Sequence, residues 1–180
     1  MKPLRYREVH LDFHTSEAVP SVGDKFDKAQ FQAALKAGHV DSITVFSKCH
    51  HGWAYHPSTA NEMHPKLKFD LLGAQLEACR EIGVNAPVYL SAGHDEKYAR
   101  RHPEDIVKWH PGDGADFLNA AYYHLICYNT PYLDYLMAQV EEVMQKYNPS
   151  GIFLDISAPR ACVCNRCIES MRKLGLDPRN

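Results

Sequence analysis

The sequence predicts an α/β fold of four successive strand–helix units, which corresponds to the first half of a (β/α)8 TIM barrel. Short apolar runs alternate with longer segments whose apolar residues recur at helical spacing, and this order is typical of a parallel sheet covered by helices. No glycine-rich phosphate-binding loop follows the first run, which disfavours the alternative of an open doubly wound sheet. With 180 residues, 45% of them hydrophobic, the chain is expected to form one domain over residues 1–180.

The first unit joins a strand at residues 7–14 to a helix that begins near Asp27. Apolar side chains alternate with polar ones in this strand: Val9, Leu11 and Phe13 against His10, Asp12 and His14. Asp27 is a good N-cap because Gln30 follows three residues later, and Gly38 is expected to end the helix.

The next two units follow the same plan. The second strand is expected at residues 42–48 and its helix at residues 69–82, ended by Gly83. The third strand is expected at residues 86–91. A connection over residues 93–129 then shows only short helical patterns, and connections of this length are often part of a site.

The last long helix is predicted to begin at Thr130-Pro131, a cap followed by a proline in the first turn. Five apolar residues at helical spacing predict its buried face: Leu133, Leu136, Met137, Val140 and Met144. A fourth strand at residues 151–156 and a final helix at residues 167–174 complete the four units.

Charge and hydropathy exclude several classes of partner. The formal net charge of −2 indicates no basic patch, so no nucleic-acid partner is expected. A run of about 18 apolar residues is absent, which predicts no membrane span, and residues 1–7 lack the apolar core of a signal peptide, which predicts a cytoplasmic location. Because a half-barrel exposes strand edges and apolar surface, the chain is expected to form a homo-oligomer.

Chemically active side chains follow the carboxyl ends of the predicted strands, where function gathers in α/β proteins. They are His10, Asp12 and His14, then His50 and His51, then Ser91 and Asp95, and finally Asp155. Imidazoles beside the aromatic rings of Trp53, Tyr55 and Tyr89 suit a carbohydrate ligand, because its hydroxyls need hydrogen bonds and its ring needs a flat apolar surface. Alternatively, the histidines cap a loop and the aromatic rings belong to the core; the run Tyr122-Tyr123-His124 either lines the site or covers the barrel top.

Asp155 is the strongest candidate for a catalytic residue. It interrupts an apolar strand, so its charge must be stabilised by neighbouring donors, which the nearby histidines provide. A carboxylate held in this way can attack an anomeric carbon and form a covalent glycosyl-enzyme. The alternative is that Asp155 caps a loop or bonds to the backbone of a neighbouring strand.

The segment Lys48-Cys49-His50-His51-Gly52-Trp53, followed by Pro57-Ser58, resembles the Lys-His-His-Asp-Gly-Phe and Trp-Pro-Ser segments of family-29 α-L-fucosidases. The whole chain is also similar to hypothetical glycoside hydrolases of fucosidase-like type, often joined to a β-galactosidase-type trimerisation domain. These resemblances imply an N-terminal half of a glycosidase barrel, in which Asp155 is the nucleophile of a retaining reaction. They also imply that His50 and His51 bind sugar hydroxyls, with His10 or His14 as the first-strand histidine. One departure is Gly52, which follows the histidine pair where those enzymes have an aspartate.

A retaining glycosidase needs a second carboxyl group about 5 Å from the first. By the resemblance this acid/base belongs to the later half of the barrel, and Asp12, Asp95 and Glu96 are unranked substitutes in this chain. Enzyme activity is therefore left open. The competing hypothesis is a zinc-stabilised half-barrel that binds carbohydrate or only self-assembles, and a third is a catalytic metal held by the His and Asp residues of the first two strand ends.

Three closely spaced cysteines, Cys162, Cys164 and Cys167, form a soft ligand set suited to tetrahedral zinc. Cys127 is the expected fourth ligand, because it lies just before the long helix that neighbours the fourth unit. The pattern resembles the Cys-x-Cys-x-x-Cys and lone cysteine of family-42 β-galactosidases, which implies a structural Zn²⁺. The alternatives are unligated thiols or a disulfide. Cys49 and Cys79 are interpreted as ordinary core residues.

Overall fold

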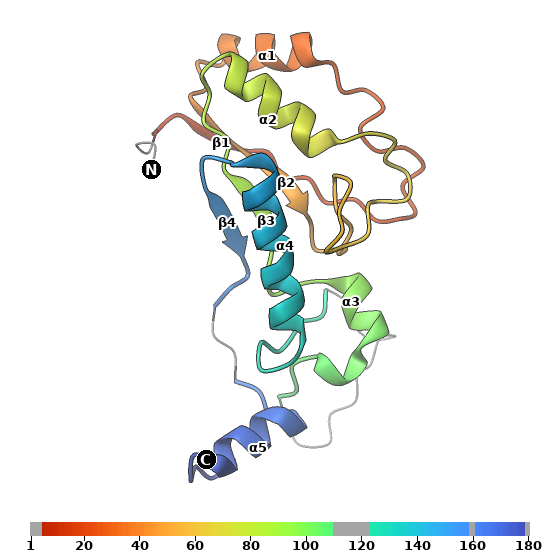
Figure 1. Ribbon diagram of the computed structural model, residues 1–180, viewed down its shortest axis with the longest axis vertical. Coiled ribbons are helices and arrows are strands. Elements are labelled where there is room, and N and C mark those ends of the chain that lie inside the picture. The colour runs from red at the N-terminus through yellow and green to blue at the C-terminus, as the bar shows by residue number, and fades with distance from the viewer. Residues whose placement is uncertain (1–4, 110–122, 159–160, 179–180) are drawn as a thin grey trace.

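The fold is a curled sheet of four parallel strands with its long helices on the outer face, as seen in a computed structural model (Figure 1). The structure describes residues 5–109, 123–158 and 161–178. The strands, which pair in chain order, are β1 (Glu8–His10), β2 (Ser42–Lys48), β3 (Val88–Ser91) and β4 (Ile152–Asp155). Sequential parallel order with helices outside is the arrangement of a half-barrel, as predicted, and not of a doubly wound sheet.

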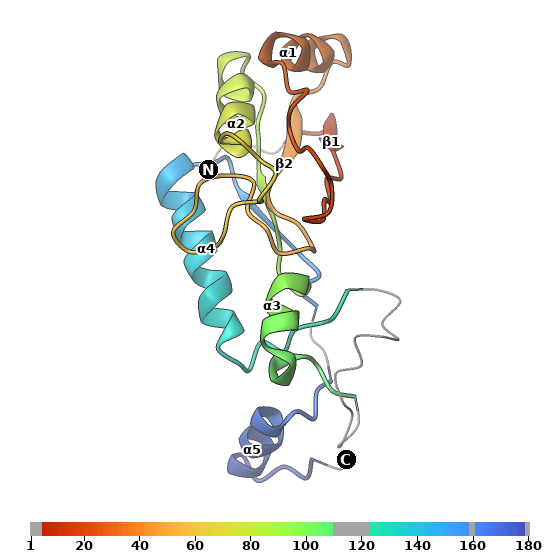
Figure 2. The same cartoon turned by 90° about the vertical axis from the view of Figure 1, so that its right-hand side faces the viewer.

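Three helices cover the outer face of the sheet: α1 (Lys28–Ala37), α2 (Leu71–Glu81) and α4 (Tyr132–Tyr147). Figure 2 shows α2 and α4 on the same side of the strands. Their apolar side chains pack with those of the sheet in one cluster, which includes Leu35, Ile43, Val45, Leu72, Leu76, Cys79, Val88, Leu90 and Val143. Because this cluster takes every second strand residue, the residues between them point to the inner face.

The start of α1 is the predicted one, and α2 begins at a cap of the same kind that was not predicted. Asp27 accepts a hydrogen bond from the backbone N–H of Gln30 (2.7 Å), and Gly38 ends α1 as expected. Asp70 caps α2 in the same way through Gly73 (2.8 Å). The second strand also has its predicted bounds. Short-range signals were sufficient at the start of α1 because caps and turn residues act within a few residues of sequence.

The remaining helices differ from the predicted scheme. The connection after β3 contains α3 (Glu96–Arg101) and η1 (Pro103–Asp105), where only short patterns were visible. The final helix, α5 (Asn165–Lys173), lies at the end of the molecule opposite α1 and not against the sheet (Figure 1). It has no buried residue, so it is not packed into the core as an outer barrel helix is. Within the described parts of the chain, no helix combines the length and apolarity of a membrane span.

Two predictions of extent and burial are wrong in part. The first strand was expected over residues 7–14, but β1 ends at His10 and all of it is exposed. Beyond His10 the chain parts from β2 around a cavity of about 290 Å³ lined in part by Leu11, Phe13 and Phe46. The buried face of α4 was predicted only in part: Leu136 is buried and Val140 packs against the core, but Leu133, Met137 and Met144 are exposed. Tyr132, Gln139 and Val143 are buried in their place.

Candidate functional site

The inner face of the sheet carries a stack of aromatic rings that leads to Asp155. The ring of Tyr89 lies between those of Phe46 and Phe153, with centroid distances of 4.0 and 5.8 Å and nearly parallel planes. The register explains this row, since Phe46 pairs with Tyr89 and Tyr89 pairs with Phe153. Tyr89 is only 1% exposed, so both ring faces are already covered and none is offered to a sugar.

The carboxylate of Asp155 is held by two donors on different oxygen atoms. The Tyr89 hydroxyl donates to Oδ2 at 2.6 Å, and the backbone N–H of Ile156 donates to Oδ1 at 2.9 Å. Burial and this hydrogen bond to Asp155 raise the pKa of Tyr89, so the phenol keeps its proton and remains a donor. The side chain of Asp155 is 32% exposed, which leaves it accessible to a ligand from the interior of the half-barrel.

His50 faces Asp155 across the ends of neighbouring strands. Its Nε2 atom lies 3.9 Å from Asp155 Oδ2, and its Nδ1 atom lies 2.7 Å from Ser91 Oγ. Burial, together with the nearby rings of His14 and His94, lowers the pKa of His50 to about 4, so the imidazole is neutral at pH 7. Ser91 donates its own proton to the His94 carbonyl (2.7 Å), so we assign the imidazole proton to Nδ1, which leaves Nε2 as an acceptor toward the site.

The segment after β1 brings a second imidazole and a carboxylate to this group. His14 Nε2 lies 2.7 Å from Asp12 Oδ1, and the rings of His14 and His50 are 4.1 Å apart between centroids. His10 packs its ring against the aromatic stack, 5.7 Å from Tyr89. The side chain of Asp12 is 67% exposed. The predicted meeting of first-strand and second-strand residues with Asp155 is therefore present in the structure.

His51 and Trp53 point to a different part of the rim. His51 Nε2 lies 2.8 Å from the Tyr123 hydroxyl, and burial lowers the pKa of His51. Trp53 donates from Nε1 to Glu17 (3.2 Å), while Lys97 Nζ lies 4.8 Å from its ring centroid. The adjacent pair His50-His51 thus serves two neighbouring positions rather than one.

Gly52 lies in the loop between the histidine pair and Trp53. Its φ of 91° is a conformation that favours glycine, and a Cβ atom there would lie 2.1 Å from Asp95 Oδ1. Asp95 in turn forms an ion pair with Lys48 (2.8 Å), and both side chains are fully buried. The carboxylate of Asp95 therefore fills the space beside the histidine pair and anchors the loop. Its burial and pairing remove it from the three unranked substitutes for an acid/base.

Several residues near the site were not identified by sequence reasoning. His94 contacts His50 with ring centroids 4.9 Å apart, and Glu17 accepts from Trp53; both lie in loops without a recognisable pattern.

Glu96 is paired with His124 (2.9 Å) and Arg100 (3.3 Å). For the run Tyr122-Tyr123-His124, the structure places Tyr123 and His124 at the rim of the site, while Tyr122 lies outside the described residues.

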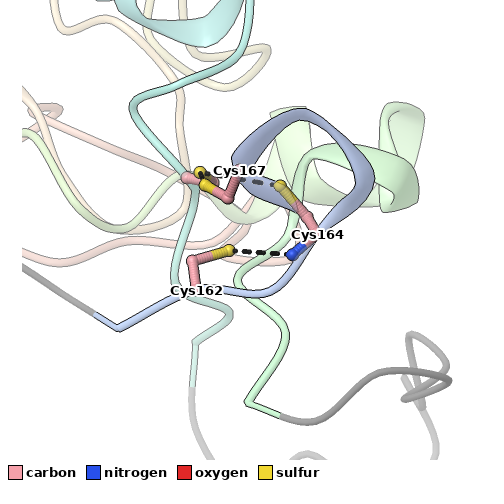
Figure 3. A group of neighbouring side chains, drawn as sticks. Cys162, Cys164 and Cys167 are labelled. Carbon is pink, nitrogen blue, oxygen red and sulfur yellow. Dashed lines mark hydrogen bonds between the residues drawn. The ribbon is translucent and has the colours of Figure 1, made fainter. Parts of the chain in front are cut away.

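The four predicted zinc ligands form a separate cluster below the sheet. The sulfur atoms of Cys127, Cys162, Cys164 and Cys167 all lie within 4.8 Å of one another. Figure 3 shows the three cysteines at the start of α5 gathered around one point. The Cys127–Cys167 and Cys127–Cys164 sulfur distances are 3.4 and 3.9 Å, close to the roughly 3.8 Å of a tetrahedron with Zn–S bonds of about 2.3 Å. The donor set therefore fits a metal ion.

Backbone hydrogen bonds hold this cluster together from three segments. Val163 donates to the Lys108 carbonyl (2.9 Å), and Cys127 donates to the Asp105 carbonyl (2.9 Å). Within the described residues, the cysteines are the only group of His, Cys, Asp or Glu atoms close enough to hold a metal. The histidines and aspartates at the first two strand ends do not gather in this way, which is evidence against the hypothesis of a catalytic metal there.

Comparison with solved structures reveals relatives of known fold. An α-L-fucosidase isoenzyme 2 from Paenibacillus thiaminolyticus is 53% identical, with a TM-score of 0.92 over 98% of this chain and 27% of that chain. An α-fucosidase from Thermotoga maritima in complex with fucose is 23% identical, with a TM-score of 0.55 over 84% of this chain and 32% of its own. A hypothetical protein from Ruminiclostridium thermocellum is 17% identical, with a TM-score of 0.59 over 74% and 71% of the two chains.

The similarities to the Thermotoga maritima enzyme and to the Ruminiclostridium thermocellum protein concern the fold alone. The chain spans 27% of the length of the Paenibacillus thiaminolyticus fucosidase and 32% of the Thermotoga maritima one. No curated protein matches the sequence. Residues 27–156, which hold most of the sheet, its three outer helices and Asp155, match the family described as hypothetical glycosyl hydrolase 6. The chain therefore belongs to the hypothetical glycosyl hydrolase 6 family.

Proposed function

We propose that this chain carries the nucleophile half of a retaining, fucosidase-like glycoside hydrolase site, with Asp155 as the nucleophile. One observation carries the proposal: Asp155 is fixed by Tyr89 and Ile156, yet it remains partly exposed and faces the acceptor nitrogen of His50 at 3.9 Å. A carboxylate held by two donors has a fixed orientation, as a nucleophile must have. Membership of a glycosyl hydrolase family supports the reaction class.

The reaction follows from this geometry in two steps. An oxygen of Asp155 attacks the anomeric carbon, and the bond from that carbon to the leaving oxygen breaks as the leaving group takes the electron pair and a proton from a general acid. Water then gives a proton to the conjugate base of that acid, attacks the same carbon and releases the Asp155 carboxylate. His50 Nε2 accepts a hydrogen bond from a sugar hydroxyl, and His51 and Trp53 contact a second part of the ligand.

The proposed substrate is an α-L-fucoside. The support is the fucosidase from Paenibacillus thiaminolyticus, which is 53% identical to this chain in an alignment that covers 98% of this chain and 27% of the fucosidase. The histidine pair and Asp155 are the residues through which the sequence resembles fucosidases. Asp12 and Glu96 are the remaining candidates within this chain for the second carboxyl group, and Asp12 is the more exposed of the two.

A fluorinated sugar tests the nucleophile without the need for an acid/base. 2-Deoxy-2-fluoro-α-L-fucosyl fluoride has a leaving group that departs without protonation, and its fluorine at carbon 2 slows hydrolysis of the adduct. We expect the purified chain to gain one fluorofucosyl unit, measured by intact mass, and peptide mapping to place it on Asp155. Asp155→Asn should give no adduct, whereas Asp134→Asn on the exposed side of α4 should label like the wild type.

Absence of an adduct on the folded wild-type chain would refute the proposal for this chain. If fucose still perturbed the NMR signals of His50 and Trp53, the result would favour the alternative of a carbohydrate-binding half-barrel without chemistry. An adduct on a residue other than Asp155 would equally reject the assigned nucleophile.

We also propose that the four cysteines bind a structural Zn²⁺. A complete set of four thiolates leaves no position for substrate, so the ion would join the start of α5 to the segment before α4. We expect one zinc per chain by elemental analysis, and Cys164→Ser should lower this ratio and the melting temperature. Cys79→Ala, which removes a buried thiol from α2, should keep the zinc. Full zinc content in Cys164→Ser would contradict the site.

A further inference from the structure

We infer that Tyr128 is a positioning residue for Asp155: its hydroxyl holds the Ile156 carbonyl and thereby keeps the Ile156 N–H on the Asp155 carboxylate. The consequence for catalysis rests on the proposed function, but the geometric link does not. Tyr128 is distant from Asp155 in sequence and lies beside the cysteine cluster. Its contact with Ile156 is 3.1 Å between the hydroxyl and the carbonyl oxygen.

The backbone of Ile156 has an unusual conformation. Its φ is 56°, and among the described non-glycine residues only His39 and Asn148 share a positive φ. Asparagine and histidine visit this region readily, but a β-branched residue does so only when its surroundings impose it. The residue directly after the proposed nucleophile is therefore held in a conformation that it would not adopt alone.

Two groups impose this conformation. Tyr128 donates to the Ile156 carbonyl from one side, and Gly93 makes room for it on the other. A Cβ atom at Gly93 would lie 2.2 Å from the Ile156 carbonyl oxygen and 2.7 Å from its Cγ2 atom. The N–H groups of Ala92 and Gly93 also donate to the Asp155 carbonyl, at 2.9 and 3.4 Å. Hydrogen bonds thus hold both the Asp155 carbonyl before Ile156 and the carbonyl of Ile156 itself.

The Ile156 carbonyl that Tyr128 holds and the Ile156 N–H belong to one tight turn. In this turn the N–H lies 2.9 Å from Asp155 Oδ1, while Tyr89 occupies Oδ2. The N–H lies in the peptide before the φ bond, which Ala92 and Gly93 hold through the Asp155 carbonyl, so Tyr128 acts on it through the turn and not directly. Without the hydroxyl, relaxation of the strained Ile156 would move the adjoining peptide, which carries one of the two donors of the carboxylate.

Tyr128 is itself rigidly placed. The neighbouring residues Ile126 and Cys127 donate backbone hydrogen bonds to Gly93 (3.0 Å) and Asp105 (2.9 Å), and the Tyr128 ring stacks on Tyr132 with planes 9° apart. The hydroxyl therefore projects from a fixed segment toward Ile156. Because Cys127 is one of the four clustered cysteines, Tyr128 also links that cluster to the proposed nucleophile.

The first test compares two variants by amide NMR and by the rate of labelling. Tyr128→Phe removes only the hydroxyl, and Tyr147→Phe, which loses a hydroxyl bonded to Asp70 (2.8 Å) on the far end of α4, is the matched control. We expect Tyr128→Phe to shift the Ile156 amide signal in a ¹H–¹⁵N spectrum and to speed its hydrogen exchange. We also expect it to slow labelling of Asp155 by the fluorofucosyl fluoride about tenfold. Tyr147→Phe should change neither.

Ile156→Gly provides the second test, because glycine adopts a positive φ without a steric penalty. In that background we expect Tyr128→Phe to slow labelling less than about twofold, since the turn no longer depends on the hydroxyl. An unchanged Ile156 amide in Tyr128→Phe would overturn the inference. If the wild-type chain does not label at all, the proposed function fails separately, and the amide signal still decides whether Tyr128 holds the turn.

Discussion

At the scale of single residues, the hydrogen-bond donors to the Asp155 carboxylate differ from those that the sequence predicted. The sequence required that Asp155, at the end of an apolar strand, be stabilised by neighbouring groups, and histidines were the predicted source. In the structure, the donors are instead Tyr89 and the backbone of Ile156, and His50 presents an acceptor nitrogen 3.9 Å from the carboxylate. The role of Tyr89 depends on strand register, since its hydroxyl reaches Asp155 only because Tyr89 lies opposite Phe153. No local pattern reports such a register.

Gly52 allows a prediction about stability. Gly52→Ala should lower the free energy of unfolding by more than about 2 kcal/mol, because the added methyl group meets the buried Asp95 carboxylate and the φ is positive. Gly83→Ala is the matched control: its φ is 71°, but nothing lies within 4 Å of the added Cβ, so the loss should be about 1 kcal/mol. Urea unfolding measures both, and equal losses would show that the Asp95 contact is unimportant.

The lowered pKa of His50 predicts that the free energy of unfolding depends on pH. Its pKa is lowered from 6.5 to about 4 by burial, so the unfolded chain binds a proton at a higher pH than the folded chain does. This group therefore leaves stability unaffected above pH 6.5 and reduces it, by up to about 3 kcal/mol, as the pH falls to about 4.

His50→Gln should make the loss of stability between pH 6.5 and pH 4 smaller, as measured by urea unfolding at several pH values. His102→Gln replaces a histidine whose side chain is 44% exposed at the end of α3 and serves as the control. Parallel pH profiles for the wild type and His50→Gln would show that His50 is not the group that titrates.

At the scale of elements, helix boundaries were predicted well and helix faces less well. The N-cap of α1 and the bounds of β2 follow from residues a few positions apart. The face of α4 does not, because ten of its 16 residues are apolar or aromatic and several stripes are possible. The sheet selects the stripe that contains Leu136 and Val143, and Leu133, Met137 and Met144 remain outside.

A matched pair of substitutions on α4 tests this assignment. Leu136→Ala removes a side chain that is 3% exposed and should cost about 2–5 kcal/mol of unfolding free energy. Leu133→Ala removes a side chain that is 41% exposed and should cost less than about 1 kcal/mol. The measurement is urea unfolding at a protein concentration where the chain is monomeric. A larger loss for Leu133→Ala would reverse the predicted orientation of α4.

At the scale of the whole molecule, the two edges of the sheet have no partner strand within the described residues. β4 exposes Phe153 on the inner face of the sheet and Leu154 on the outer face, at 44% and 40%. Exposed apolar residues beside an open strand edge favour association. The relatives of fucosidase type extend well beyond the region that this chain matches, so the same surface lies within a longer polypeptide there.

We therefore expect the purified chain to self-associate, as measured by analytical ultracentrifugation over a range of concentrations. Leu154→Glu should shift the distribution toward monomer, because it places a charge on the apolar surface of β4. Leu174→Glu changes a leucine that is 75% exposed after α5 and should leave the distribution unchanged. A wild-type chain that is monomeric at every concentration would contradict this prediction.

The sequence by itself determined the order of strands and helices, the cap of α1, the bounds of β2, and the four cysteines that gather into one cluster. These features depend on neighbours in sequence or on a residue type with few alternative uses. Only the tertiary structure decided that Tyr89 and Ile156 orient Asp155, that His50 and His51 diverge, and that α5 lies apart from the sheet. Each of those outcomes depends on register, on burial or on the left-handed backbone of Ile156, and these arise only when distant segments pack together.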